Sequence, residues 1–136
     1  MISAFELIEH IEDWKSFIDN ICHVTNRYIF LSTPTGRMRE YEKHMGHYRN
    51  FQRGELECYL ESKGFRKIKV IYAGFPFWSP ITRDVLNLKK EQEEQDGMLL
   101  SFNKIVHTVM YFLYRYCSSK HMGDQLLLIY EKCKKD

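Results

Sequence analysis

The sequence predicts an α/β protein with a mostly parallel sheet and helices on both faces. Over residues 2–73, short apolar runs alternate with amphipathic runs that have helical spacing. Strands that alternate with helices form crossover units, which produce parallel sheets. The chain has 136 residues, of which 44% are hydrophobic and 28% are charged. This is the composition of one globular domain with its own core.

The first strand and the first helix are predicted within residues 2–24. Residues 2–8 are mostly apolar, as in a strand that is buried on both faces. Glu12 and Asp13 favour a helix start because carboxylates stabilise the positive end of a helix. Apolar residues at helical spacing then predict an amphipathic helix over residues 13–24.

Two more strands and a helix follow. Tyr28–Leu31 predict a second strand that Pro34 ends, since proline has no N–H to donate. Residues 35–51 predict a long loop, and loops of that length are often functional. The run "QRGELECYLESKGF" predicts a helix that ends at Gly64 in the left-handed conformation, and "KIKVIYAG" predicts the third strand.

The last part of the chain departs from this alternation. Pro76 and Pro80 mark a break, and charges at helical spacing predict a solvated helix over residues 82–96. A wide apolar stripe predicts a helix over residues 98–117, which we expect to pack in the core. A lid, a dimer face and an interfacial membrane helix are the alternatives. The run "QLLLIYEK" predicts a final strand.

Composition limits the classes of partner and location. The net charge of +2 is too small to indicate a nucleic-acid partner. No stretch is long and apolar enough to predict a membrane span, and no signal peptide is visible. The four cysteines form no CxxC pair, so we expect reduced thiols and a cytoplasmic protein.

Four ordered runs carry a family resemblance: "FELIEHIEDW", "YIFLSTP", "GHYRNFQRGELECYLESKGF" and "LLLIYEK". Together they resemble the C-terminal half of a class I S-adenosylmethionine-dependent methyltransferase. The resemblance implies a three-layer Rossmann-like methyltransferase sheet that is partial. Residues 2–8, 28–32, 68–73 and 125–131 would be its strands four to seven, with the last strand antiparallel and inserted between the fifth and sixth. Residues 1–136 would then form the C-terminal half of one domain, with a helical insertion at about 76–123.

This resemblance implies methyl transfer from S-adenosylmethionine to an oxygen or nitrogen of a small-molecule acceptor. It places Glu6 and Leu7 on the cofactor's side of the cleft. His10 and His47 are the expected catalytic residues, since a histidine near neutrality suits a general base that takes the acceptor's proton.

The chain lacks the Gly-rich turn with which the family contacts its cofactor, because its seven glycines are isolated. We therefore expect a truncated chain that binds S-adenosylmethionine weakly or not at all and is inactive alone. The alternative function is a non-catalytic half-domain that acts as an interaction module. Residues 2–8 would then leave an exposed apolar edge, which predicts a homo-oligomer through the first strand.

A metal site is a further hypothesis from the resemblance. Some such methyltransferases, including ones that act on small-RNA ends and on quinone precursors, hold a divalent metal with ExxEH and a later histidine. The candidate ligands here are Glu6, Glu9, His10 and His47, and the metal would orient and acidify a substrate hydroxyl. Most relatives with Glu-His need no metal, so we predict none. In that alternative, Glu9 and His10 hydrogen-bond the neighbouring loop and the start of the helix.

Overall fold

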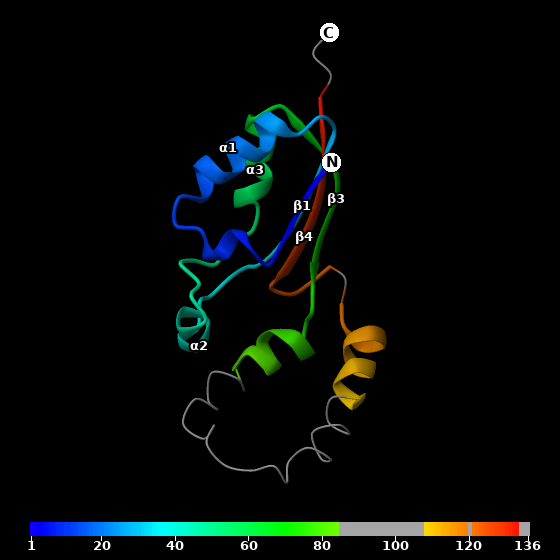
Figure 1. Ribbon diagram of the computed structural model, residues 1–136. Helices are drawn as coiled ribbons and strands as arrows, with labels where there is room; N and C mark the ends of the chain where they lie inside the picture. Colours follow the sequence, from blue (N-terminus) through cyan, green and yellow to red (C-terminus); the bar gives the residue numbers. More distant parts are fainter. Residues whose placement is uncertain (85–107, 120, 134–136) are drawn as a thin grey trace.

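The computed structural model describes residues 1–84, 108–119 and 121–133 and contains a four-stranded mixed sheet (Figure 1). The strands β1 (Ile2–Phe5), β2 (Tyr28–Pro34), β3 (Phe65–Ala73) and β4 (Gln125–Lys132) lie in the order β1-β2-β4-β3. β1 runs parallel to β2, and β4 runs antiparallel to both β2 and β3. The predicted place of the last strand, antiparallel and between two parallel strands, is confirmed.

The first strand is shorter than predicted and is not buried on both faces. Glu6 takes a positive φ of 48°, which ends β1 after Phe5, and a short 3₁₀ turn η1 (Ile8–His10) follows. Within β1 only Ala4 is buried. The reason is the position of β1, which pairs with β2 alone among the described strands and forms an edge of the sheet.

The two helices predicted within residues 13–65 are present, and one more lies where a loop is predicted. α1 (Trp14–Val24) begins after Asp13, whose carboxylate accepts the Ser16 N–H at 3.2 Å. α3 (Glu55–Ser62) is followed by Gly64 in the left-handed conformation, at φ 81°. The segment 35–51 contains the short helix α2 (Glu40–His44), which the sequence analysis missed.

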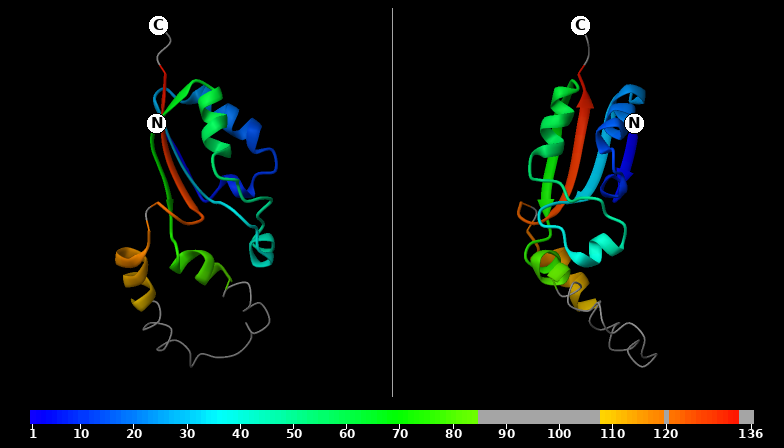
Figure 2. Two further views of the ribbon diagram at one scale, coloured as in Figure 1. Left: turned by 180° about the vertical axis from the view of Figure 1, so that it is seen from behind. Right: turned by 90° about the vertical axis from the view of Figure 1, so that its left-hand side faces the viewer.

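α1 and α3 both pack on the same face of the sheet, so the prediction of helices on both faces is wrong (Figure 2). The cause is topological. β1, β2 and β3 are parallel to one another, and their order across the sheet follows their order in the chain. Right-handed crossovers between such strands place both helices on one face. The core between this face and the helices includes side chains that are fully buried: Ile18, Ile29, Leu31, Phe51, Leu56, Leu60, Leu126, Leu128 and Tyr130.

The opposite face of the sheet is also apolar but less buried. Side chains alternate between the two faces of a strand, so Phe30, Leu127 and Ile129 point away from the core and are half-buried. Phe5 is 56% exposed.

The described parts of the segment 76–123 lie beyond the carboxyl ends of β1, β2 and β3 (Figure 1). They form the π-helical segments η2 (Phe77–Thr82) and η4 (Leu113–Cys117), with residues 108–112 helical before η4. The prediction that the helix over residues 98–117 packs in the core is wrong for residues 108–117, the described part. Four apolar side chains there are 51–69% exposed: Val109, Tyr111, Phe112 and Tyr116.

Residues 98–107, and most of the helix predicted over 82–96, lie outside the described residues. Within the described part of the chain, no helix has both the length and the apolar character that crossing a membrane requires.

Candidate functional site

The candidate site lies where the parallel strands β1 and β2 end. Open α/β sheets bind ligands at the carboxyl ends of their strands. η1 follows β1 at this edge, and the segment after α2 returns to it, because the Tyr48 N–H donates to the Glu9 carbonyl oxygen at 2.8 Å. Residues 36 positions apart in the sequence, such as His10 and Gly46, thereby come into contact.

Three of the four residues named as metal candidates come together here. Glu9, His10 and His47 each offer one ligand atom, and these atoms lie within 4.8 Å of one another. The two imidazole rings meet edge to face, with centroids 4.5 Å apart. The fourth candidate, Glu6, is held elsewhere, since its Oε1 accepts hydrogen bonds from Ser32 Oγ at 2.6 Å and Gln125 Nε2 at 2.7 Å.

Burial governs the protonation of Glu9. Its side chain is 1% exposed, and Oε2 accepts a hydrogen bond from Thr33 Oγ1 at 3.0 Å. Burial raises the pKa of Glu9 above the usual carboxyl value because the charged form loses its hydration. A cation beside Glu9 would favour the opposite, ionised form.

The two histidines have nitrogen atoms available for a ligand. His10 Nδ1 lies 3.1 Å from the Gly46 carbonyl oxygen, which favours a proton on Nδ1 and leaves Nε2 as the lone-pair nitrogen. His47 Nδ1 is buried and has no hydrogen-bond partner within the described ranges. Burial, followed by the nearby His10, lowers the pKa of His47, so its imidazole is neutral at pH 7.

The residues present therefore fit a divalent metal. Two imidazoles and one carboxylate form a donor set that binds such ions in proteins. The contact between His10 Nδ1 and a backbone carbonyl is the kind that orients a ligating histidine. The alternative prediction is met in part: the His10 side chain bonds the neighbouring loop. Glu9 contacts that loop only through its backbone carbonyl oxygen, and its carboxylate bonds Thr33 rather than the start of the helix.

The two residues expected to line the cofactor cleft are both accessible at this edge. Glu6 is exposed, and its backbone N–H donates to the Ser32 carbonyl oxygen at 3.0 Å. Leu7 is 43% exposed. Glu6 also connects β1 to the start of β4 through Gln125.

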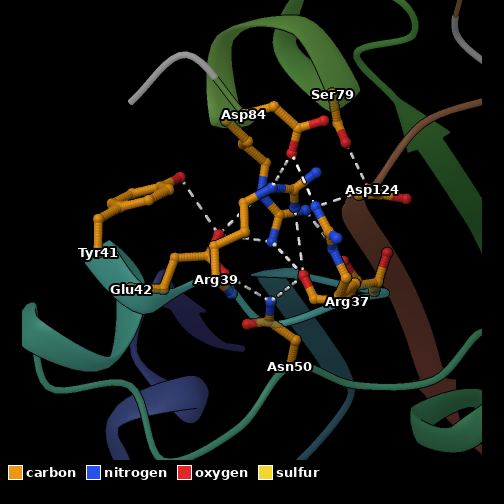
Figure 3. Close-up of polar contacts among 10 residues, drawn as sticks. Arg37, Arg39, Tyr41, Glu42, Asn50, Ser79, Asp84 and Asp124 are labelled. Carbon is orange, nitrogen blue, oxygen red and sulfur yellow. Dashed lines mark hydrogen bonds and ion pairs between the residues drawn. The ribbon is translucent and has the colours of Figure 1, made fainter. Parts of the chain in front are cut away.

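A buried ionic network that the sequence analysis missed supports the loop that carries His47 (Figure 3). Arg83 is fully buried and donates from Nε to Glu42 Oε1 at 2.7 Å. Its Nη1 donates to the Thr35 carbonyl oxygen at 3.0 Å and to Asp124 Oδ2 at 3.3 Å. No signal in the sequence links these residues, because Arg83 lies 41 positions from both Glu42 and Asp124.

Glu42 is the centre of this network. Its Oε2 accepts the Arg39 N–H at 2.8 Å and Asn50 Nδ2 at 2.9 Å. Burial alone would raise the pKa of Glu42, but these bonds and the Arg83 guanidinium hold it below the usual value. The carbonyl oxygen of Glu42 accepts the His47 N–H at 3.0 Å, so the network fixes the backbone that presents His47.

No protein-family model matches this chain, and no curated protein matches it.

Proposed function

We propose that this chain serves methyl transfer from S-adenosylmethionine to an oxygen or nitrogen atom of a small molecule. The observation that carries the proposal is the sheet, in which β4 is antiparallel between two parallel strands. The resemblance implies this arrangement together with the segment after β1 that holds Glu6, Glu9 and His10.

Direct methyl transfer asks a protein mainly to align the acceptor, the methyl carbon and the leaving sulfur. In this proposal Glu6 and Leu7 lie on the cofactor's side of the cleft. A base takes the acceptor's proton, and His47 suits this role because its lowered pKa keeps the imidazole neutral at pH 7. His10, whose ring contacts that of His47, is the other candidate base.

A divalent metal extends the proposal. Glu9, His10 and His47 would hold it, and it would orient a substrate hydroxyl and lower its pKa. Glu6 is not part of this donor set, since its carboxylate bonds Ser32 and Gln125.

Calorimetry with S-adenosylhomocysteine, the product form of the cofactor, tests the proposed function. We expect weak but saturable binding, because the sequence has no Gly-rich turn to hold the cofactor's methionine part. Glu6→Ala should remove this binding, while Glu40→Ala, a change at an exposed glutamate of α2, should not. Absence of binding at millimolar ligand would overturn cofactor use by this chain.

A non-catalytic, self-associating module is the second candidate function. The observation in its favour is β1, which forms one edge of the described sheet beside the 56% exposed Phe5. Exposed edges with apolar side chains favour pairing with another chain. In this case sedimentation should give a dimer that Phe5→Lys converts to a monomer. Val24→Lys, at a 62% exposed position of α1, is the matched control. A monomer at all concentrations contradicts this candidate.

A further inference from the structure

A second cavity lies apart from the cluster of Glu9, His10 and His47. It is a pocket of about 410 Å³, which is within the range of small-molecule sites. It lies where β3 ends and β4 begins, between η2 and η4. Its lining consists of Ala73, Gly74, Trp78, Tyr114, Ser118, Ser119 and Gln125.

The lining of the pocket favours an uncharged ligand. None of the described lining residues is ionisable at neutral pH, and most of the exposed lining is apolar. A charged ligand would lose its hydration in such a site without an opposite charge to replace it. The pocket therefore suits an uncharged compound.

Two aromatic side chains in the lining favour an aromatic ligand. The rings of Trp78 and Tyr114 lie edge to face, with centroids 6.2 Å apart. The Tyr114 hydroxyl is already bonded to Thr82 Oγ1 at 2.5 Å, so Tyr114 offers its ring rather than its hydroxyl. Aromatic rings prefer such edge or offset contacts with a further ring.

One polar atom of the Trp78 side chain has no hydrogen-bond partner. Trp78 Nε1 is buried and makes no hydrogen bond to any residue that the structure describes. An indole N–H can only donate, and a buried donor without an acceptor is costly. Trp78 Nε1 has almost no accessible surface, so Trp78 offers its ring rather than this N–H to a ligand.

The walls of the pocket are fixed by backbone contacts. The Gly74 N–H donates to the Ser119 carbonyl oxygen at 3.2 Å, and the Ser119 N–H donates to the Phe75 carbonyl oxygen at 2.9 Å. Gly123 lies so close to β3 that a Cβ there would stand 2.0 Å from the Ala73 carbonyl oxygen. The pocket thus exists without a ligand, as small-molecule sites usually do.

Gln125 connects this pocket to the proposed cofactor side. It lines the pocket, and its Nε2 donates to Glu6 Oε1 at 2.7 Å. We propose that the pocket binds an uncharged aromatic compound beside the proposed cofactor side.

The test is calorimetry of the full chain with 2-naphthol, an uncharged aromatic alcohol. We expect saturable binding that Trp78→Ala and Tyr114→Ala each weaken about tenfold, the scale of one lost aromatic contact. Tyr114→Phe keeps the ring and should bind like the wild type. Tyr111→Ala is the matched control, because Tyr111 is 55% exposed and does not line the pocket.

If a change at Trp78 or Tyr114 unfolds the chain, Ser118→Leu narrows the pocket from another side and should also weaken binding. The proposed binding in this pocket is overturned if 2-naphthol does not bind, or if it binds unchanged to the folded Trp78, Tyr114 and Ser118 variants.

S-Adenosylhomocysteine is titrated separately. If 2-naphthol binds and S-adenosylhomocysteine does not, the pocket is supported and methyl transfer is overturned. Binding of S-adenosylhomocysteine alone overturns the pocket and leaves the proposed function standing.

Discussion

Arg83 Nη2 lies 2.5 Å from Glu42 Oε1 in an ion pair whose side chains are 1% and 3% exposed. Arg83 follows η2, and Glu42 belongs to α2, so the pair joins the segment after η2 to the loop that carries His47. Removing one partner of a buried pair leaves the other charge without compensation.

Arg83→Met should therefore lower the free energy of unfolding by about 3–5 kcal/mol. Urea denaturation of the variant and the wild type measures this difference. The double variant Arg83→Met with Glu42→Leu should recover most of the loss, since a buried pair can be replaced by apolar side chains of similar size.

Arg37→Met is the matched control for the buried pair. The Arg37 side chain is 74% exposed and contacts Asp84 at 3.2 Å. Exposed pairs contribute about 0–1 kcal/mol, so this variant should stay close to the wild type. Equal losses for the two arginine variants would show that the buried network does not support the loop.

The two faces of β4 should respond differently to truncation. Leu128 is fully buried against the helices, whereas Ile129 on the opposite face is half-buried. Leu128→Ala should lower the free energy of unfolding by about 2–5 kcal/mol, and Ile129→Ala should lower it clearly less. Denaturation at several protein concentrations measures both. A large, concentration-dependent loss for Ile129→Ala would mean that a second copy covers that face.

The elements with a strong local signal were predictable from the sequence. α1 has a helical apolar stripe and Asp13 as its N-cap, and β4 is a run of alternating buried residues. The end of β1 was not predictable, because a positive φ at Glu6 has no sequence signal comparable to a glycine. The exposed edge of β1 follows from the order of the strands in the sheet, and local sequence patterns do not contain that order.

The candidate site was predictable in part. The pattern of Glu9 and His10 after an apolar strand, with a later histidine, named the residues that meet in space. Glu6 was assigned to the same cluster, although its carboxylate turns to Ser32 and Gln125. The pocket at Trp78 and Tyr114 depends on a contact between residues 36 positions apart, which no local pattern contains.

The pH dependence of stability should contain a contribution from His47. Its folded pKa is lowered by burial and by His10, while the unfolded value is near 6.5. As pH falls below 6.5, the unfolded state binds a proton that the folded state resists, so stability decreases.

His47→Gln should remove the contribution of His47 to the decrease in the free energy of unfolding between pH 7.5 and pH 5. Urea denaturation of both proteins at each pH measures it. Glu9 contributes a slope of the opposite sign, because its raised pKa makes stability fall as pH rises above the unfolded value near 4.5. The difference between variant and wild type isolates His47, and identical slopes would contradict the lowered pKa.

A divalent metal should stabilise the chain if Glu9, His10 and His47 hold one. Mn²⁺ at about a hundred times its dissociation constant should raise the free energy of unfolding by about 2.7 kcal/mol. His47→Ala and Glu9→Gln should abolish this gain, while His44→Ala, at a histidine of α2 outside the cluster, should keep it. Binding should weaken at acid pH, because ligands must be deprotonated. A thermal scan without any shift would leave these residues with a structural role only.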